Sequence, residues 1–419
     1  MSDKPSVLIF GGLNTWSRSV TAFLVPEDGE ALVSSLRIVD KFSVHPPTTY
    51  LGSQFPKILE NPLVEYKQAN LTVAAMVSKM FDPPEGQAPY TYIFDFTGEV
   101  RHDRPDMVQQ QQTMNVARLL GEEAARRDVK AYVRVSHPYY ETPEKGSHDE
   151  KESIKPVGVR GIWWHEATRV LASIEKLNLV VLRIGLCYGP YIDYGVLCST
   201  LTVAAVYGYM KKPMKGLWSP GKNSMNTVHV DDVAAAVWAL AGWMATLGRL
   251  EANTIAGEDI QTNDKSKVKD VEGVPDLSTK LVAPLFNIVD DTQSTLVSIG
   301  TEVTGLFGTT FGFHDFFTTT MVKLTKLSES VIEDINEEHV GAWVEMMQAS
   351  NPPVVKTPLS AYMDESILQK MTIAYSANKI KNVVGFQLKR PKFERAHLQE
   401  MVEKWKEEGS WPNPPEKSS

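Results

Sequence analysis

Two glycines directly after a short apolar run are the first residues in this sequence whose types and spacing could do chemistry. The apolar run 7–10 leads into Gly11 and Gly12, and a stretch with a helical pattern follows. A turn of this kind presents backbone N–H groups to a diphosphate at the N-terminus of a helix. Glycine suits it because glycine adopts positive φ and lets a ligand come close to the backbone. The turn is therefore a candidate nucleotide-binding site.

The spacing of this turn departs from the usual Gly-x-x-Gly-x-x-Gly pattern at two places. Asn14 stands in place of the second glycine and Ser17 in place of the third. Asparagine tolerates the left-handed region better than most residues, and its amide could donate to a phosphate. Ser17 is small enough for a helix to pack on a strand, and Arg18 could reach the phosphates. Two interpretations stay open: a working nucleotide site, or a turn that only connects a strand to a helix.

An acidic residue, Asp40, ends the second apolar run at 36–40. A carboxylate at the end of the second strand accepts hydrogen bonds from the adenosine ribose and repels a 2′-phosphate. It favours NAD as the cofactor, although Lys41 beside it weakens the preference and keeps NADP possible. The alternative interpretation is an exposed acid in a turn.

Short apolar runs alternate with helical patterns through the first part of the chain, and these elements must position the residues above. The runs that we interpret as strands are 7–10, 36–40, 92–96, 131–136 and 179–185. Helices are predicted over 108–127 and 162–176. Near-continuous apolar strands separated by helices are typical of a parallel sheet covered on both faces. The predicted fold class is therefore α/β, with a doubly wound parallel sheet.

The rest of the chain is more helical. Residues 226–244 predict a short strand that runs into a helix, and strand character resumes at 284–291. Between them, residues 257–280 are charged, and we interpret this segment as a structureless surface insertion.

We divide the chain into three predicted parts. Residues 1–185 form a Rossmann core, and residues 186–410 form a substrate-binding part that is interleaved with the last core strands. Residues 411–419 form a flexible tail. The length of 419 residues fits one large domain or two.

The bulk composition excludes several classes of partner. A net charge of −8 gives no case for nucleic acid or an anionic membrane surface. No run approaches the ~18 apolar residues of a membrane span. The two cysteines, Cys187 and Cys198, lie in apolar surroundings, which is typical of buried thiols in a reducing compartment. The N-terminus lacks an apolar signal core, so we expect a cytoplasmic location. No metal-ligand spacing is convincing.

Four stretches, in order along the chain, resemble those of a known family. They are LRIGLCYGP at 182–190, NTVHVDDVA at 226–234, PLFNIVDD at 284–291 and ANKIKNVVGFQLKRP at 377–391. Together they are similar to the extended short-chain dehydrogenase/reductase family, the NAD-dependent epimerase/dehydratase group. The resemblance implies a Rossmann-type doubly wound sheet with a smaller, mostly helical C-terminal substrate region. It also implies NAD and a small-molecule substrate such as a nucleotide sugar. Members of this family often form a homodimer through two helices, here 108–127 and 162–176.

The same resemblance implies further cofactor contacts. Asn70 and Leu71 stand where the family touches the adenine, and residues 96–98 stand where it lines the pyrophosphate. The full set that we expect at the dinucleotide is Gly11, Gly12, Asn14, Thr15, Trp16, Arg18, Asp40, Asn70, Leu71, Phe96, Thr97 and Gly98.

The family performs its chemistry with a Ser or Thr and a Tyr-x-x-x-Lys pair on one helix face. VRVSHPYYE at 133–141 resembles the segment that carries the serine, which falls on Ser136. The alternative is a serine that satisfies a turn at the end of a strand. The helix over 162–176 has no tyrosine, and its single lysine lies at its far end. His165 on that helix could titrate near neutral pH and take part of the electrostatic role of the lysine, or it could simply pack.

Two functions follow from this pattern. The first is an NAD(P)-dependent oxidoreductase or epimerase that acts on a nucleotide sugar or a related polar substrate, using Ser136 and an atypical acid or base. The second is a non-catalytic NAD(P)-binding relative that serves as a redox sensor or an interaction scaffold. The missing Tyr/Lys pair favours the second function, whereas Ser136 supports the first.

Overall fold

The computed structural model describes residues 4–13, 15–325 and 328–415, without the side chains of residues 15, 317, 321, 323 and 325. The chain separates into two compact units, each formed by several segments. The sheet unit comprises residues 1–185, 231–289 and 375–389. The helical unit comprises residues 186–230, 290–374 and 390–419.

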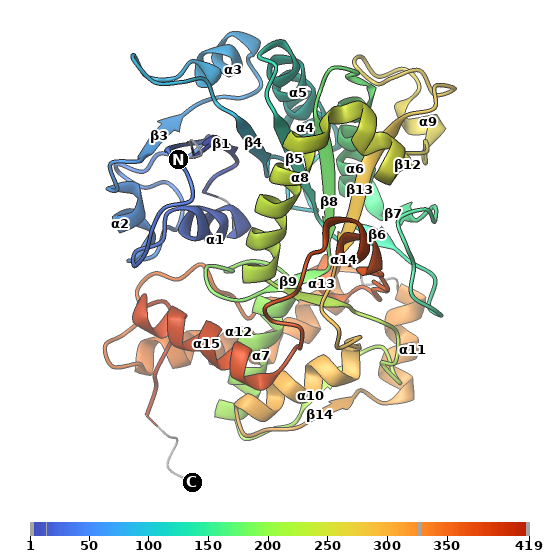
Figure 1. The fold of residues 1–419 in the computed structure, drawn as a ribbon. Helices are drawn as coiled ribbons and strands as arrows, with labels where there is room; N and C mark the ends of the chain where they lie inside the picture. The colour runs from blue at the N-terminus through green and yellow to red at the C-terminus, as the bar shows by residue number, and fades with distance from the viewer. Residues whose placement is uncertain (1–3, 14, 326–327, 416–419) are drawn as a thin grey trace. The chain divides into compact units, whose positions relative to one another are not determined.

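An eight-stranded sheet organises the sheet unit (Figure 1), with the strand order β12-β13-β8-β5-β4-β1-β2-β3. Its strands are β1 Ser6–Phe10, β2 Ser35–Asp40, β3 Val64–Gln68, β4 Tyr92–Asp95, β5 Ala131–Ser136, β8 Leu179–Ile184, β12 Gly257–Asp259 and β13 Val282–Ile288. All neighbours are parallel except the edge pair β12 and β13. The strand order reverses between β1 and β4, which is the signature of a doubly wound sheet. The predicted fold class is confirmed.

The buried strands follow the predicted apolar runs closely. Every residue of β1, β5 and β8 is buried, so both faces of these strands are covered. The edge strand β3 has no counterpart among the predicted runs, because its sequence VEYKQ is half-buried at most. A half-buried edge strand does not produce a continuous apolar run.

Helices cover the sheet of this unit. They are α1 Thr15–Leu24, α2 Phe55–Leu59, α3 Ala74–Phe81, α4 Asp106–Gln109, the π-helix Gln110–Asn115, α5 Val116–Arg126, α6 Gly158–Ser173, α8 Val230–Ala256, α9 Lys265–Val268 and α14 Asn378–Val384. A short hairpin pairs β6 Tyr140–Glu141 with β7 Lys155–Pro156. The predicted helix over 108–127 is three elements, because a π-helical turn interrupts it. The predicted helix over 162–176 is α6, which begins four residues earlier.

Helix α8 is long and strongly apolar. By length and composition alone it could cross a membrane, with a mean hydropathy of 1.4. The core helix of a soluble protein passes the same test. Its backbone breaks at Gly248, and its Trp238 and Trp243 rings contact Tyr92 of β4 and Phe286 of β13. These contacts are those of a helix that covers a sheet.

The charged segment 257–280 is not a structureless surface insertion, as its composition had suggested. It opens with β12, which adds an antiparallel strand to the sheet edge, and it contains α9. Ile260 and Val268 from this segment are buried in the main hydrophobic core. The charged residues mask these apolar positions in the sequence, so the prediction was wrong.

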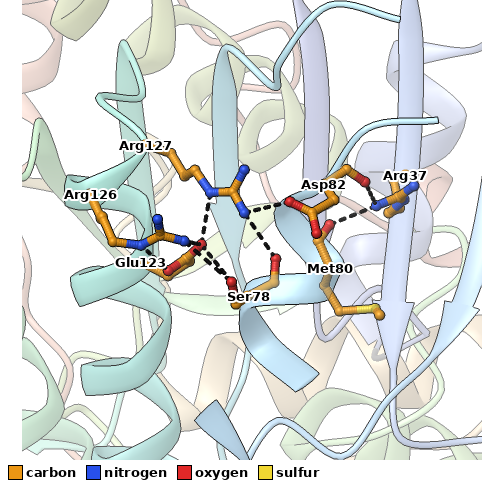
Figure 2. Close-up of polar contacts among 7 residues, drawn as sticks. All are labelled: Arg37, Ser78, Met80, Asp82, Glu123, Arg126 and Arg127. Carbon is orange, nitrogen blue, oxygen red and sulfur yellow. Dashed lines mark hydrogen bonds and ion pairs between the residues drawn. The ribbon is translucent and has the colours of Figure 1, made fainter. Parts of the chain in front are cut away.

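A polar network fixes α3 and α5 to each other (Figure 2). Glu123 of α5 pairs with Arg126 and Arg127, and Arg127 also reaches Asp82 at the end of α3. Ser78 of α3 donates to Glu123 at 3.2 Å. The carbonyls of Met80 and Asp82 accept from the buried Arg37 of β2. The network holds the outer helices in register with the strand that ends at the candidate site.

The helical unit is built separately. Its helices are α7 Val196–Tyr209, α10 Leu296–Leu306, α11 Phe316–Thr325, α12 Glu329–Ala349, α13 Glu365–Leu368 and α15 Arg395–Glu407. Two short parallel pairs complete it: β9 Leu186–Tyr188 with β11 Thr227–His229, and β10 Met214–Gly216 with β14 Phe311–Phe313. The predicted strand that runs into a helix over 226–244 is β11 followed by α8.

Candidate nucleotide-binding site

In a doubly wound sheet ligands bind in a crevice outside the carboxyl ends of the strands where the direction of winding changes, which here are β1 and β4. In such a sheet the half around β1, β2 and β3 receives the adenine nucleotide. The half around β4 and β5 receives the second nucleotide of a dinucleotide. We call these the adenine half and the second half of the crevice.

The glycine turn in the adenine half has the geometry that requires glycine. Gly11 has φ +73°, and a Cβ on it would lie 2.9 Å from the carbonyl carbon of Phe96. A Cβ on Gly12 would lie 2.2 Å from Cγ2 of Ile38. Ser17 Oγ donates to the Gly11 carbonyl at 2.8 Å, so the serine closes the turn from the first part of α1.

The other residues predicted at this turn are either outside the described residues or buried. Asn14 lies outside the described residues, and the side chain of Thr15, the first residue of α1, is also outside them. Arg18 is 1% exposed, so its side chain lies inside the unit rather than in open solvent at the turn. Trp16 is buried as well.

Asp40 is a buried carboxylate, not an exposed turn acid. Its Oδ2 accepts from the Leu13 N–H at 3.0 Å, and its Oδ1 accepts from the Lys41 N–H at 2.6 Å. Burial raises the pKa of Asp40, and these backbone donors oppose the rise. A carboxylate has about four acceptor sites, so Asp40 keeps capacity for ribose hydroxyls while it fixes the glycine turn.

Asn70 and Leu71 follow β3 and have structural partners. Asn70 Oδ1 accepts from the N–H and the hydroxyl of Thr72, at 3.1 and 2.8 Å. Leu71 is buried in the main core of the sheet unit. In this conformation Asn70 stabilises the turn that leads to α3.

The residues after β4 lie against the second half of the crevice. Thr97 donates to Asp95 at 2.6 Å and is buried, as is Phe96. Gly98 has φ +140°, and a Cβ on it would lie 2.4 Å from the Trp164 ring. Glycine is therefore required at this position because a tryptophan of α6 lies directly on the backbone.

Four rings fill the second half, and we call them the aromatic cluster: Trp16, His137, Tyr139 and Trp164. The centroid of His137 lies 3.9 Å from that of Trp16, 4.6 Å from Tyr139 and 4.5 Å from Trp164. The rings come from the first turn of α1, the segment after β5, and α6. These elements surround the place that the second nucleotide requires.

Two arginines contact the aromatic cluster, and one of them is paired with a buried carboxylate. The Arg134 guanidinium lies 4.6 Å from the Trp164 ring, and that of Arg160 lies 3.9 Å from the Tyr139 ring. Burial, together with these two cations, holds the pKa of His137 well below its usual range. His137 is therefore neutral. The two guanidinium groups are attracted to the faces of the Trp164 and Tyr139 rings.

The two halves therefore fit a dinucleotide differently. The adenine half keeps the glycine turn, the N-terminus of α1 and the acid after β2. The second half is occupied by buried side chains of the chain itself: Trp164 is 1% exposed and His137 5%. A nicotinamide nucleotide does not fit the second half as it is arranged here.

Ser136 lies at the end of β5 in a second, polar group of side chains. The Tyr140 hydroxyl is 3.1 Å from His165 Nδ1, and His165 Nε2 is 2.6 Å from the Gln261 carbonyl. A carbonyl only accepts, so Nε2 carries the hydrogen, and Nδ1 accepts from the phenol. Ser136 Oγ has no hydrogen-bond partner of good geometry among the described residues. Its hydroxyl is nevertheless close enough to Tyr140 to lower the pKa of the phenol.

The titration of this polar group differs from the expectation for His165. Burial lowers the pKa of His165 to about 4, so the ring is neutral at pH 7 and does not supply the charge of a lysine. Burial raises the pKa of Tyr140, and Arg183, 5.0 Å from its ring, opposes this rise. A cavity of about 30 Å³ lies among these side chains, which is room for a water molecule.

Arg160 and Trp164 lie four residues apart on α6, which is the spacing of the family's Tyr and Lys. Arg160 donates to the Val100 carbonyl, and Trp164 Nε1 donates to the Glu99 carbonyl at 3.0 Å. Both side chains fix α6 to the loop after β4. No group of three or more His, Cys, Asp or Glu side chains suited to a metal ion occurs among the described residues.

Sequence reasoning missed two arginines. Arg134 lies beside the aromatic cluster, and Arg183 lies beside the polar group around Ser136. Each interrupts an apolar strand, β5 or β8, and each is buried. Arg134 pairs with the equally buried Asp95 at 2.8 Å. The sequence does contain a signal for them, since each is a charged residue inside a continuous apolar run. Such a residue indicates a buried charge, and a buried charge requires a partner.

Comparison with known proteins supports the predicted family. Residues 54–250 match the model of the NAD dependent epimerase/dehydratase family. A comparison with curated proteins finds no match.

Solved structures share the fold across nearly the whole chain. The UDP-glucose 4-epimerase of Thermotoga maritima, solved with UDP-glucose, has a TM-score of 0.60 at 14% identity and covers 96% of this chain and 99% of that chain. The dTDP-glucose 4,6-dehydratase of Bacillus anthracis, solved with NAD, gives 0.59 at 15%, with coverages of 97% and 98%. WbmG of Bordetella bronchiseptica, solved with NAD and UDP, gives 0.60 at 12%, with coverages of 98% and 99%. At these identities the likeness concerns the fold.

Proposed function

Residues 54–250 match the model of the NAD dependent epimerase/dehydratase family, and from this match together with the site we propose a non-catalytic nucleotide-binding function. The protein binds the adenosine diphosphate portion of NAD in the adenine half of its crevice. It does not carry out hydride transfer, because the second half is filled.

The aromatic cluster is the observation that carries this proposal. Its rings touch one another at centroid distances of 3.9 to 4.6 Å around His137, so no ligand can enter without displacing them. Trp164 is further held by a hydrogen bond to the Glu99 carbonyl. Removing a buried ring of this size from its contacts costs about 3–5 kcal/mol. Nicotinamide would have to repay that cost before it gained any affinity.

The proton-transfer groups support the same conclusion. General acid–base catalysis needs a group whose pKa lies near the working pH and whose proton can reach the substrate. Both nitrogens of His165 are occupied by Tyr140 and Gln261, and its pKa lies at about 4. The Tyr140 proton points to His165. The hydrogen bonds of His165 therefore serve to connect α6 with Tyr140 and with the segment after β12.

This proposal selects the second of the two functions that the sequence left open, the non-catalytic relative, and it also chooses between a redox sensor and a scaffold. NAD and NADH differ only in the nicotinamide ring, and that ring makes no contact in the filled half. The protein therefore responds to adenine nucleotide and not to redox state, which favours a nucleotide-responsive scaffold over a redox sensor.

Calorimetric titration with ADP-ribose, NAD⁺ and NADH tests the proposal. We expect all three to bind with dissociation constants that agree within about threefold, since each carries the same adenosine diphosphate. If NAD⁺ binds at least about tenfold more tightly than ADP-ribose, the protein binds the nicotinamide as well and the proposal fails. Absence of binding by all three ligands would reject nucleotide binding altogether.

A second candidate function is an oxidoreductase or epimerase on a nucleotide sugar, and the polar group around Ser136 favours it. Ser136, Tyr140 and Arg183 line the 30 Å³ cavity, which places a hydroxyl, a phenol and a cation together. Two measurements with NAD⁺ and UDP-glucose or dTDP-glucose test this candidate: absorbance at 340 nm detects net hydride transfer to NAD⁺, and chromatography of the sugar nucleotide detects a redox-neutral epimerisation or dehydration. Turnover that Ser136→Ala removes while ADP-ribose affinity is kept would support it. No turnover with either sugar would leave the first function.

A further inference from the structure

The helical unit contains a large cavity that the proposed function does not use. Its volume is about 500 Å³, within the usual range of about 300–1,000 Å³ for small-molecule sites. Side chains of α7, β10, α10, β14, α11 and α12 line it, together with residues 363–371. Most of the lining is apolar, for example Val203, Met214, Leu296, Ile299 and Ile335.

The charges of this cavity argue against an anionic ligand. Its one described lysine, Lys215, is opposed by the carboxylates of Asp334 and Glu338. All three side chains are exposed, so the charge lies on the solvent side of the cavity. Glu338 also pairs with Lys212. No cluster of arginine or lysine is present among the described lining residues to hold a diphosphate, and a phosphate in this cavity would lose its hydration without gaining a counterion.

His339 of α12 supplies one specific polar group in the lining. It is 2% exposed, and its Nε2 lies 2.8 Å from Oδ1 of Asn336. The amide nitrogen of Asn336 donates to the carbonyls of Ile332 and Met363, and its Oδ1 accepts from the Met363 N–H. These bonds fix Oδ1 as an acceptor, so the hydrogen of His339 is on Nε2.

The other nitrogen of His339 is therefore a bare acceptor. Nδ1 is buried and has no hydrogen-bond partner among the described residues. Burial lowers the pKa of His339 to about 4, so the ring stays neutral at pH 7. A buried acceptor without a donor is unfavourable, and a ligand hydroxyl would remove that cost.

We propose that this cavity binds an uncharged alcohol with an apolar skeleton, whose hydroxyl donates to Nδ1 of His339. The apolar walls accept the skeleton, and the carboxylates at the solvent side exclude anionic forms of the same molecule. The site lies within the helical unit and is independent of the nucleotide site, so either proposal can fail without the other.

Displacement of Nile red from the full-length protein tests the site, because this probe is uncharged and has no hydrogen to donate. Three competitors share one skeleton: farnesol, farnesene without the hydroxyl, and farnesyl diphosphate with an anionic group. We expect farnesol to compete about threefold to tenfold better than farnesene, the usual range for one hydrogen bond. Farnesyl diphosphate should be the weakest by about a hundredfold. Equal competition by farnesol and farnesyl diphosphate would overturn the proposal.

Two variants separate the cavity from non-specific adsorption. Leu296→Trp fills the cavity and should abolish Nile red binding, whereas Leu250→Trp, on the exposed surface of α8, should leave it unchanged. His339→Phe should retain Nile red and lose the preference for farnesol over farnesene. Melting curves confirm that each variant folds. Unchanged Nile red binding by a folded Leu296→Trp, or a farnesol preference that survives in His339→Phe, would contradict the site.

Discussion

The two halves of the crevice lie at the edge of one sheet, on either side of the point where its winding reverses, and they have opposite contents. In the adenine half, Gly11, Gly12 and Asp40 form a turn in which backbone groups and a carboxylate define the site. In the second half, the aromatic cluster fills the equivalent position. The difference teaches that a doubly wound sheet preserves a place for two nucleotides, whereas a few side chains decide whether each place is open.

The largest expected effect comes from removing a ring of the aromatic cluster. Trp164→Ala should destabilise the protein by about 3–5 kcal/mol, because it deletes a fully buried side chain that touches Gly98, His137 and Tyr139. Urea denaturation measures the change in the free energy of unfolding. Leu250→Ala, at an 84% exposed position, is the matched control and should change little. A loss below about 1 kcal/mol would mean that the second half is loosely filled and can open.

The pH dependence of stability sharpens the assignment of His165 as a structural group. Burial lowers its folded pKa to about 4, from 6.5 in the unfolded chain. The unfolded chain therefore binds the proton more readily, so the contribution of His165 is complete above pH 6.5 and is lost as pH falls towards 4. His165→Gln should reduce the loss of stability between pH 7 and pH 5 by about 2 kcal/mol. The free energy of unfolding at the two pH values, by urea titration, measures it.

An unchanged difference between the two pH values in His165→Gln would show that His165 is not buried neutral, and would return it to the candidate acids and bases. His45→Gln is the control, since His45 is an exposed histidine of the same unit.

The smallest expected effect concerns the adenine half. Ser17→Ala removes the hydrogen bond from Ser17 Oγ to the Gly11 carbonyl and should cost about 1 kcal/mol, measured by thermal unfolding. It should also weaken ADP-ribose binding, because the glycine turn loses its closure. Thr254→Ala removes a similar but exposed bond to a helix carbonyl and is the control. Equal effects of the two substitutions would remove the special role of Ser17.

The sequence predicted the adenine half better than the second half, for a physical reason. The glycine turn and Asp40 are local features: each lies at the end of an apolar strand, where neighbouring residues define its geometry. Asn14 and the side chain of Thr15 stay predictions, because both lie outside the described residues. The strand β3 was missed because it is partly exposed and so has no continuous apolar run.

The second half depends on contacts between distant segments. Trp16, His137 and Trp164 meet only when β1, β5 and α6 are assembled, and no spacing in the sequence announces the contact. Trp16 could be placed near a cofactor by its position in the turn, yet the turn alone does not show which side its ring occupies. The partner of His165, the Gln261 carbonyl, likewise lies in a segment whose charge suggested a surface insertion.

A crystal structure of the complex with NAD⁺ tests the central claim most directly. Our account predicts an ordered adenosine diphosphate beside Asp40 and the glycine turn, with Trp16 still against His137 and the nicotinamide outside the second half. A nicotinamide ring ordered beside Ser136, with Trp16 or Trp164 displaced, would contradict it.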